Sequence, residues 1–153
     1  MPFFNQALAK SARWFPWFTE LIRWQMRGMV IGDIEKTNRQ LMSSIPAADK
    51  ADLYAPQDFG MYVSAVREGF RSGSRGVAWD DILINQAWGF DLAGVQPRIY
   101  IWHGEADVNV PLHAARFLGA VIPHTRVTFL PGKGHFFLFN CWQDMLSRLV
   151  SEA

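Results

Sequence analysis

The sequence has little that would support secretion, membrane insertion or nucleic-acid binding. Its only cysteine is Cys141, which excludes an intramolecular disulfide and any zinc site built on cysteines. Fifteen basic residues balance fourteen acidic ones, so the chain has no excess of positive charge that would attract nucleic acid. No uncharged apolar run reaches the roughly 18 residues of a membrane-spanning helix, and charges interrupt the N-terminal region too often for a signal peptide. We therefore expect a cytoplasmic protein without a transmembrane segment or a nucleic-acid partner.

Repeats, low-complexity segments and metal-ligand spacings are also missing. The four histidines are too scattered along the chain to indicate a metal site, and we expect no cofactor. In contrast, half of the 153 residues are apolar, and they include seven tryptophans and twelve phenylalanines. This composition is typical of a packed globular protein and argues against disorder.

Residues 1–76 have the pattern of short helices joined by prolines. Apolar residues recur at three- and four-residue steps through residues 14–29, which predicts an amphipathic helix. Gly32 and Asp33 then indicate a helix end and the N-cap of a second helix, and a third is expected over residues 59–71. Short helices rich in Trp, Phe and Met suit a lid over an apolar pocket.

Residues 77–153 contain a pattern of strand, helix, strand and helix. We expect strands over residues 98–102 and 126–130, a helix over 111–121 between them, and a last helix that carries Phe136 on a wide apolar face. Two strands joined by a helix predict a right-handed βαβ unit with parallel strands, and hence an α/β fold. The loops that follow the two strands should therefore lie side by side at one edge of the sheet.

These two loops contain Asp107 and His135. A catalytic imidazole needs a partner that fixes its tautomer and stabilises its protonated form, and a carboxylate on the neighbouring loop can do both. Gly132 and Gly134 allow the second loop to turn sharply. Alone, His135 would be interpreted as a helix-capping histidine and Asp107 as a turn or N-cap aspartate. Their expected proximity favours a catalytic acid–base pair.

Two motifs resemble a known family. "WHGEADVNVP" at residues 102–111, followed by "PGKGHF" at 131–136, is similar to the C-terminal part of the α/β-hydrolase superfamily. The resemblance implies that Asp107 is the acid and His135 the base of a Ser-His-Asp triad. It further implies ester- or amide-type hydrolysis of a small-molecule acyl substrate. The implied fold is partial: a helical cap over residues 1–76, then the C-terminal part of the hydrolase core as a short parallel βαβα unit over 77–153.

The nucleophile that this family requires is missing from the sequence. It should precede the acid on a strand–turn–helix elbow reading G-x-S-x-G, and no such motif occurs. The nearest approach is "SGSRG", with Ser74 at its centre. The residues before it are typical of a helix instead of a strand, and those after Gly76 do not indicate a helix. Asp80 and Asp81 also lack an elbow, and Cys141 is interpreted as a core residue. We expect the chain alone to be inactive, with the serine supplied from outside it.

The remaining histidines have no expected catalytic role. His103 lies in a segment that resembles an oxyanion loop, but the acid loop already occupies that segment, so we interpret this histidine as structural. His113 and His124 are expected to be solvated.

The expected two-stranded sheet is marginal by itself, and the edge of its first strand is apolar. We therefore expect self-association or a partner chain at this edge. An alternative function is a non-catalytic interaction module or an inactive truncated product. Another is a membrane-surface role for "ARWFPWFTELIRWQMR" at residues 12–27, because interfacial peptides combine tryptophan with arginine.

Overall fold

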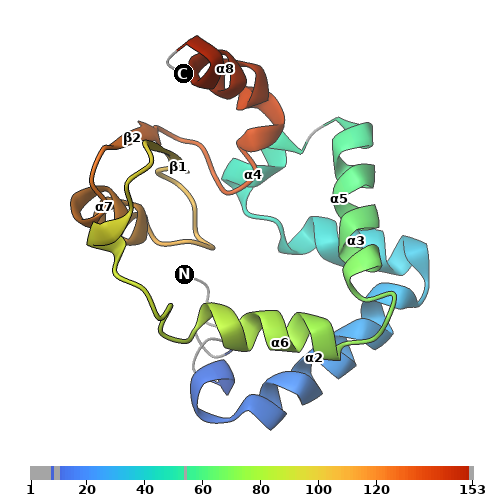
Figure 1. The fold of residues 1–153 in the computed structure, drawn as a ribbon. Coiled ribbons are helices and arrows are strands. Elements are labelled where there is room, and N and C mark those ends of the chain that lie inside the picture. The colour runs from blue at the N-terminus through green and yellow to red at the C-terminus, as the bar shows by residue number, and fades with distance from the viewer. Residues whose placement is uncertain (1–7, 9–10, 54, 152–153) are drawn as a thin grey trace. The chain divides into compact units, whose positions relative to one another are not determined.

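The protein has a mixed α/β fold, mostly helical, with a two-stranded parallel sheet. The computed structural model describes residues 8, 11–53 and 55–151. In chain order the elements are α2 (Pro16–Ile31), α3 (Ile34–Ser44), α4 (Ala47–Asp52), α5 (Pro56–Gly69), α6 (Arg75–Ile84), the 3₁₀ helix η1 (Leu92–Gly94), β1 (Ile99–Gly104), α7 (Leu112–Val121), β2 (Thr125–Leu130) and α8 (Leu138–Ser151) (Figure 1).

The chain forms two compact units, each discontinuous in sequence. The first comprises Met1–Ile45 and Phe59–Gly89, and the second comprises Pro46–Asp58 and Phe90–Ala153. This division differs from the boundary after residue 76 that the sequence suggested. The difference has two physical causes: α6 packs on α2 in the first unit, and α4 bonds to the loop before α8 in the second.

Helix ends in the first unit follow the local signals in the sequence. Pro16 is the first residue of α2, where its missing N–H has no helical partner to lose. The Asp33 side chain accepts a hydrogen bond from the Lys36 N–H at 2.9 Å, so the predicted N-cap of α3 is confirmed. Between α2 and α6, Arg23 donates two hydrogen bonds to Asp81, of 2.6 and 2.9 Å.

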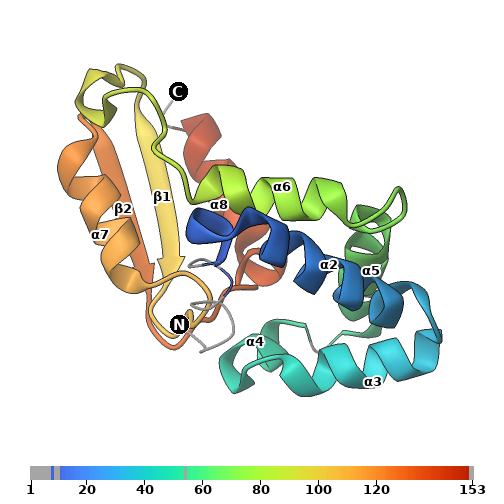
Figure 2. The same ribbon diagram turned by 90° about the horizontal axis from the view of Figure 1, so that it is seen from below.

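The predicted parallel βαβ unit is confirmed in the second unit. β1 pairs with β2 from Ile99↔Thr125 to Gly104↔Leu130, so both strands end at the same edge of the sheet (Figure 2). α7 packs against both strands. It approaches closely at Gly119, where a Cβ would overlap the Val127 side chain. The loops that follow β1 and β2 are consequently neighbours.

The structure differs from the sequence interpretation in how the apolar helix faces are used. On α2 the buried residues are Thr19 and Val30, whereas most of the predicted apolar stripe is exposed, as Leu21 is at 49% and Met29 at 45%. On α8 no residue is buried, and Trp142 is 53% exposed. For α8, which belongs to the same unit as the sheet, the reason is that two strands offer too little surface to cover such a helix.

Two helices were not expected from the sequence. α6 begins at Arg75, directly after Ser74, so the expectation that no helix follows "SGSRG" is wrong. Its buried side chains are Ala78 and Ile82, one turn apart and on one face, whereas its two aspartates and Trp79 hide this pattern in the sequence. α4 has six residues, which is too short for apolar periodicity to reveal.

Candidate active site

The candidate site is built from the two loops that follow the parallel strands. We name residues 105–111 the aspartate loop and residues 131–137 the histidine loop. The N–H of Glu105 donates to the Leu130 carbonyl at 3.0 Å, and the N–H of Ala106 donates to the Lys133 carbonyl at 2.9 Å. The sheet's hydrogen bonding thus continues past the strand ends, and it holds the two loops in register.

The aspartate loop fixes the Asp107 carboxylate with its own backbone. Oδ1 of Asp107 accepts hydrogen bonds from the N–H groups of Asn109 at 2.7 Å and Val110 at 2.9 Å. The side chain is only 5% exposed. Two backbone donors and little solvent leave the carboxylate one orientation, with Oδ2 turned towards the histidine loop.

His135 meets this carboxylate directly. Its Nδ1 lies 2.8 Å from Oδ2 of Asp107. A carboxylate can only accept, so Nδ1 carries the proton in this contact and the neutral ring has its lone pair on Nε2. The His135 side chain is 39% exposed, and Nε2 has no hydrogen-bond partner among the described residues. An oriented, partly exposed imidazole whose Nε2 is unpaired in the described part of the chain is the arrangement that a general base requires.

Three glycines permit the close packing and the turn around these loops. A Cβ on Gly104 would overlap the carbonyl oxygens of Lys133 and Gly134. A Cβ on Gly134 would overlap the carboxylate of Asp49. Gly132 has a positive φ of 70°, which glycine adopts without strain. The predicted glycine turn is confirmed at Gly132, whereas Gly134 is needed because the Asp49 carboxylate occupies the place of a Cβ.

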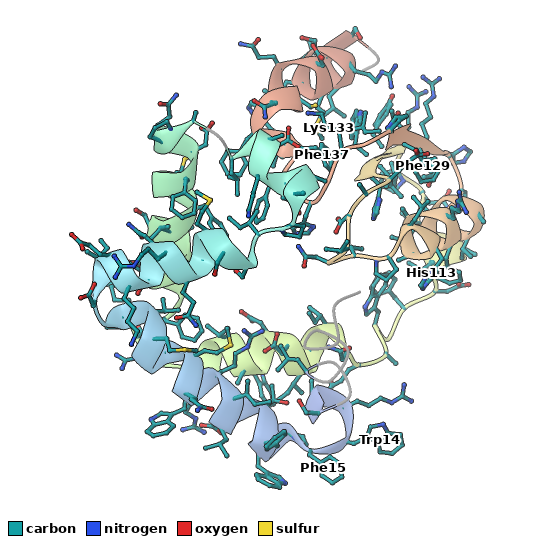
Figure 3. The ribbon with its side chains drawn as sticks, turned by 180° about the vertical axis from the view of Figure 1, so that it is seen from behind. Trp14, Phe15, His113, Phe129, Lys133 and Phe137 are labelled. Atoms are coloured by element: carbon teal, nitrogen blue, oxygen red, sulfur yellow. The ribbon has the colours of Figure 1, made fainter. Side chains whose placement is uncertain are left out.

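The structure adds two buried aspartates that sequence reasoning missed. Asp49 and Asp52 of α4 are 0% and 2% exposed. Oδ1 of Asp49 accepts from the Phe136 N–H at 2.9 Å. Oδ1 of Asp52 accepts from Nζ of Lys133 at 2.6 Å, and this hydrogen bond raises the pKa of Lys133. Lys133 and Phe137 mark this part of the histidine loop (Figure 3). No sequence signal links α4 to a loop more than 80 positions away.

Ser74 lacks the geometry of a catalytic nucleophile. It lies between two helices, α5 and α6, and not at the end of a strand. Its φ and ψ are −99° and −15°, within the helical region, whereas a nucleophile elbow holds its serine in a strained conformation. The side chain is 7% exposed. These observations agree with the expectation that Ser74 is not the nucleophile.

The other residues considered from the sequence have structural positions or are solvated. Asp81 is paired with Arg23, and Asp80 is exposed on α6. His103 is buried in β1, with Nδ1 2.8 Å from the Gly104 carbonyl oxygen. His113 and His124 are exposed, as expected. Cys141 is half-buried, and the expectation that it belongs to the core is wrong because α8 has no buried residue.

Within residues 8, 11–53 and 55–151, no three His, Cys, Asp or Glu residues lie together in a way that could hold a metal ion. The helices in this part of the chain are all too short or too polar to cross a membrane. Comparison with protein-family models, curated proteins and solved structures gives no match for the chain.

Proposed function

We propose that the chain supplies the acid and the base of a hydrolase of the α/β-hydrolase type. The observation that carries the proposal is the 2.8 Å contact between Nδ1 of His135 and Oδ2 of Asp107. Both residues lie at the carboxyl ends of adjacent parallel strands, where open α/β sheets place their functional loops. The substrate class is a small molecule with an acyl or ester-type bond.

In the proposed mechanism, Nε2 of His135 removes the proton of a serine hydroxyl as the serine oxygen attacks the substrate carbonyl. The negative charge of Asp107 stabilises the imidazolium formed at His135. Two backbone N–H groups already orient the Asp107 carboxylate, so it need not move during this step. The imidazolium then returns the proton to the leaving group as the tetrahedral intermediate collapses. Water repeats the sequence on the acyl-serine and releases the acid.

The serine of this mechanism comes from outside the described chain. Ser74 is helical in conformation and almost fully buried, so it does not offer an attacking hydroxyl. The large apolar side chains left exposed on α2, α6 and α8 support a partner polypeptide, because single domains seldom leave so much apolar surface uncovered. We propose that this partner carries the nucleophile elbow and extends the sheet beside β1.

The experiment that tests the proposal begins with the coding sequence immediately upstream of the Met1 codon, read in three frames. A strand, a G-x-S-x-G turn and a helix encoded there would then be co-expressed with this chain. We expect the elbow serine to react with a fluorophosphonate probe, and we expect His135→Ala to abolish most of the labelling. His113→Ala is the matched control, since His113 is an exposed histidine of the same unit.

Two results would contradict the proposal. One is labelling that persists at the wild-type rate in His135→Ala, because the serine would then be activated by another base. The other is an upstream sequence without any elbow, because we propose that the partner with the elbow is encoded immediately upstream. This chain by itself should not react with the probe at any serine.

A second candidate is a non-catalytic interaction module, favoured by the same exposed apolar surface and by the helical conformation of Ser74. It predicts that His135→Ala changes partner binding or stability while no hydrolytic rate exists to lose. The membrane-surface alternative is weakened because Arg23 and Arg27 bind Asp81 and the Phe70 carbonyl instead of facing solvent. We expect anionic vesicles to cause no blue shift of tryptophan fluorescence.

A further inference from the structure

The feature that the proposed mechanism leaves unexplained is the burial of two carboxylates on the six-residue helix α4. Asp49 and Asp52 are almost completely removed from solvent, at 0% and 2% exposed. Burying a carboxylate costs several kcal/mol unless donors compensate for the lost water. Each of these two carboxylates directs one oxygen at the segment that carries His135. Their contacts therefore bear on the position of that histidine.

Asp49 contacts the chain on both sides of His135. Its Oδ1 accepts a hydrogen bond of 2.9 Å from the N–H of Phe136, the residue that follows the histidine. The same oxygen lies against Gly134, the residue that precedes it, so closely that a Cβ there would overlap the carboxylate. One buried atom thus constrains the backbone immediately before and immediately after the imidazole.

Asp52 holds the same segment further out. Its Oδ1 accepts from Nζ of Lys133 at 2.6 Å and from Nδ2 of Asn140 at 2.9 Å. These two residues are the second before His135 and the fifth after it. The histidine loop is consequently tied to α4 by Asp49 beside the histidine and by Asp52 at Lys133, and Asp52 also bonds to the first turn of α8.

The partner of His135 is fixed by different means. Asp107 receives two N–H groups from its own loop, and this arrangement does not involve α4. A contact of 2.8 Å between two side chains requires both to be held, because rotation or displacement of either one breaks it. The aspartate side is held by the aspartate loop, so the histidine side needs an anchor of its own.

We propose that Asp49 is a positioning residue for His135. It holds the backbone of Gly134 and Phe136 at the place from which Nδ1 reaches Oδ2 of Asp107, and it takes no part in proton transfer. The inference rests on the proposed function for its catalytic meaning. The geometric claim itself concerns the His135–Asp107 hydrogen bond and can be tested without any turnover.

The experiment uses the full chain labelled with ¹⁵N and observes the Nδ1–H resonance of His135 by NMR. Asp107→Asn identifies the resonance by abolishing it. We expect Asp49→Ala to abolish or broaden the same resonance, and Asp49→Asn to retain it because the amide Oδ1 still accepts from the Phe136 N–H. Val127→Ala is the control for lost stability, since the Val127 side chain of β2 packs against Gly119 of α7. It should leave the resonance in place.

A second measurement covers the case in which Asp49→Ala does not fold. Amide hydrogen exchange of Phe136 should be protected in the wild type and in Asp49→Asn. Where Asp49→Ala does fold, the protection factor of the Phe136 amide should be at least about tenfold lower than in the wild type. This is the size of effect expected when a hydrogen bond to a carboxylate is lost.

Three results would overturn the proposal. The first is an Asp49→Ala protein that keeps the His135 resonance at its wild-type position, and the second is rapid exchange of the Phe136 amide in the wild type. The third is loss of the resonance in Asp49→Asn despite its retained acceptor. Failure of the proposed function gives a different pattern, in which these signals behave as expected but the co-expressed elbow serine stays unlabelled.

Discussion

Nζ of Lys133 lies 2.6 Å from Oδ1 of Asp52, and the two side chains have very different environments. The lysine is 38% exposed, whereas the aspartate is 1% exposed. The pair connects the histidine loop to α4, and its removal leaves a buried carboxylate with Asn140 as its remaining side-chain donor. We expect Lys133→Met to lower the free energy of unfolding by about 1–3 kcal/mol. Lys50→Met, which removes an exposed lysine of α4, is the control and should change it by less than about 0.5 kcal/mol.

The same pair predicts a pH dependence of stability. The hydrogen bond to Asp52 raises the pKa of Lys133 above its ordinary value of 10.5. A group with a raised folded-state pKa contributes its full stabilisation below the unfolded-state value and loses it as the pH rises through the folded-state value. The difference in unfolding free energy between wild type and Lys133→Met should therefore be constant from pH 7 to about 10 and shrink above 10.5. Urea denaturation of both proteins at several pH values measures this difference. A difference that grows as the pH rises above about 10 would contradict a raised pKa of Lys133 in the folded state.

Gly104 is the second test of the loop geometry. Its missing side chain makes room for the carbonyl oxygens of Lys133 and Gly134, so Gly104→Ala forces the two loops apart. We expect a loss of at least about 2 kcal/mol in unfolding free energy and loss of the His135 Nδ1–H resonance. Gly94→Ala is the matched control in the same unit, because a Cβ there meets nothing within 4 Å. Equal stability of the two variants would show that the loops do not approach as described.

Arg23 and Asp81 provide a test of the first unit. They form a two-bonded ion pair with side chains 15% and 13% exposed, and it joins α2 to α6. Removing Arg23 leaves the nearly buried Asp81 carboxylate without its ion-pair partner. Arg23→Met should therefore lower the free energy of unfolding by about 3 kcal/mol in thermal or chemical denaturation. Glu20→Gln breaks the exposed Arg75–Glu20 pair and should cost less than about 0.5 kcal/mol. Similar small losses in both variants would mean that the Arg23 pair is solvated in solution.

Self-association of the isolated chain remains a prediction, and the exposed apolar side chains strengthen it. Trp17 is 67% exposed, Trp79 58% and Trp142 53%. We expect the sedimentation coefficient to rise with protein concentration in the micromolar range, because water is excluded from such surfaces on association. A monomer that is independent of concentration and melts cooperatively would contradict this expectation.

Local sequence patterns were enough to predict the βαβ unit and the candidate pair. Alternating strand and helix patterns, closed by Pro-Gly and His-Gly turns, specify a parallel βαβ unit. That topology places Asp107 and His135 on neighbouring loops, and this required no distant contact to infer. The N-cap at Asp33 was readable for the same reason, since a cap depends on residues three positions apart.

In contrast, long-range packing determines which elements support the histidine loop and which helix faces stay exposed. Asp49 is 87 residues from Phe136 in the sequence, and nothing in "AADKAD" distinguishes a buried acceptor from a solvated turn of helix. The apolar stripes of α2 and α8 predicted amphipathic helices correctly, but not whether a surface exists to cover them. The apolar periodicity of a helix shows which of its faces could be buried. Whether that face is buried depends on which other elements pack against it in the fold.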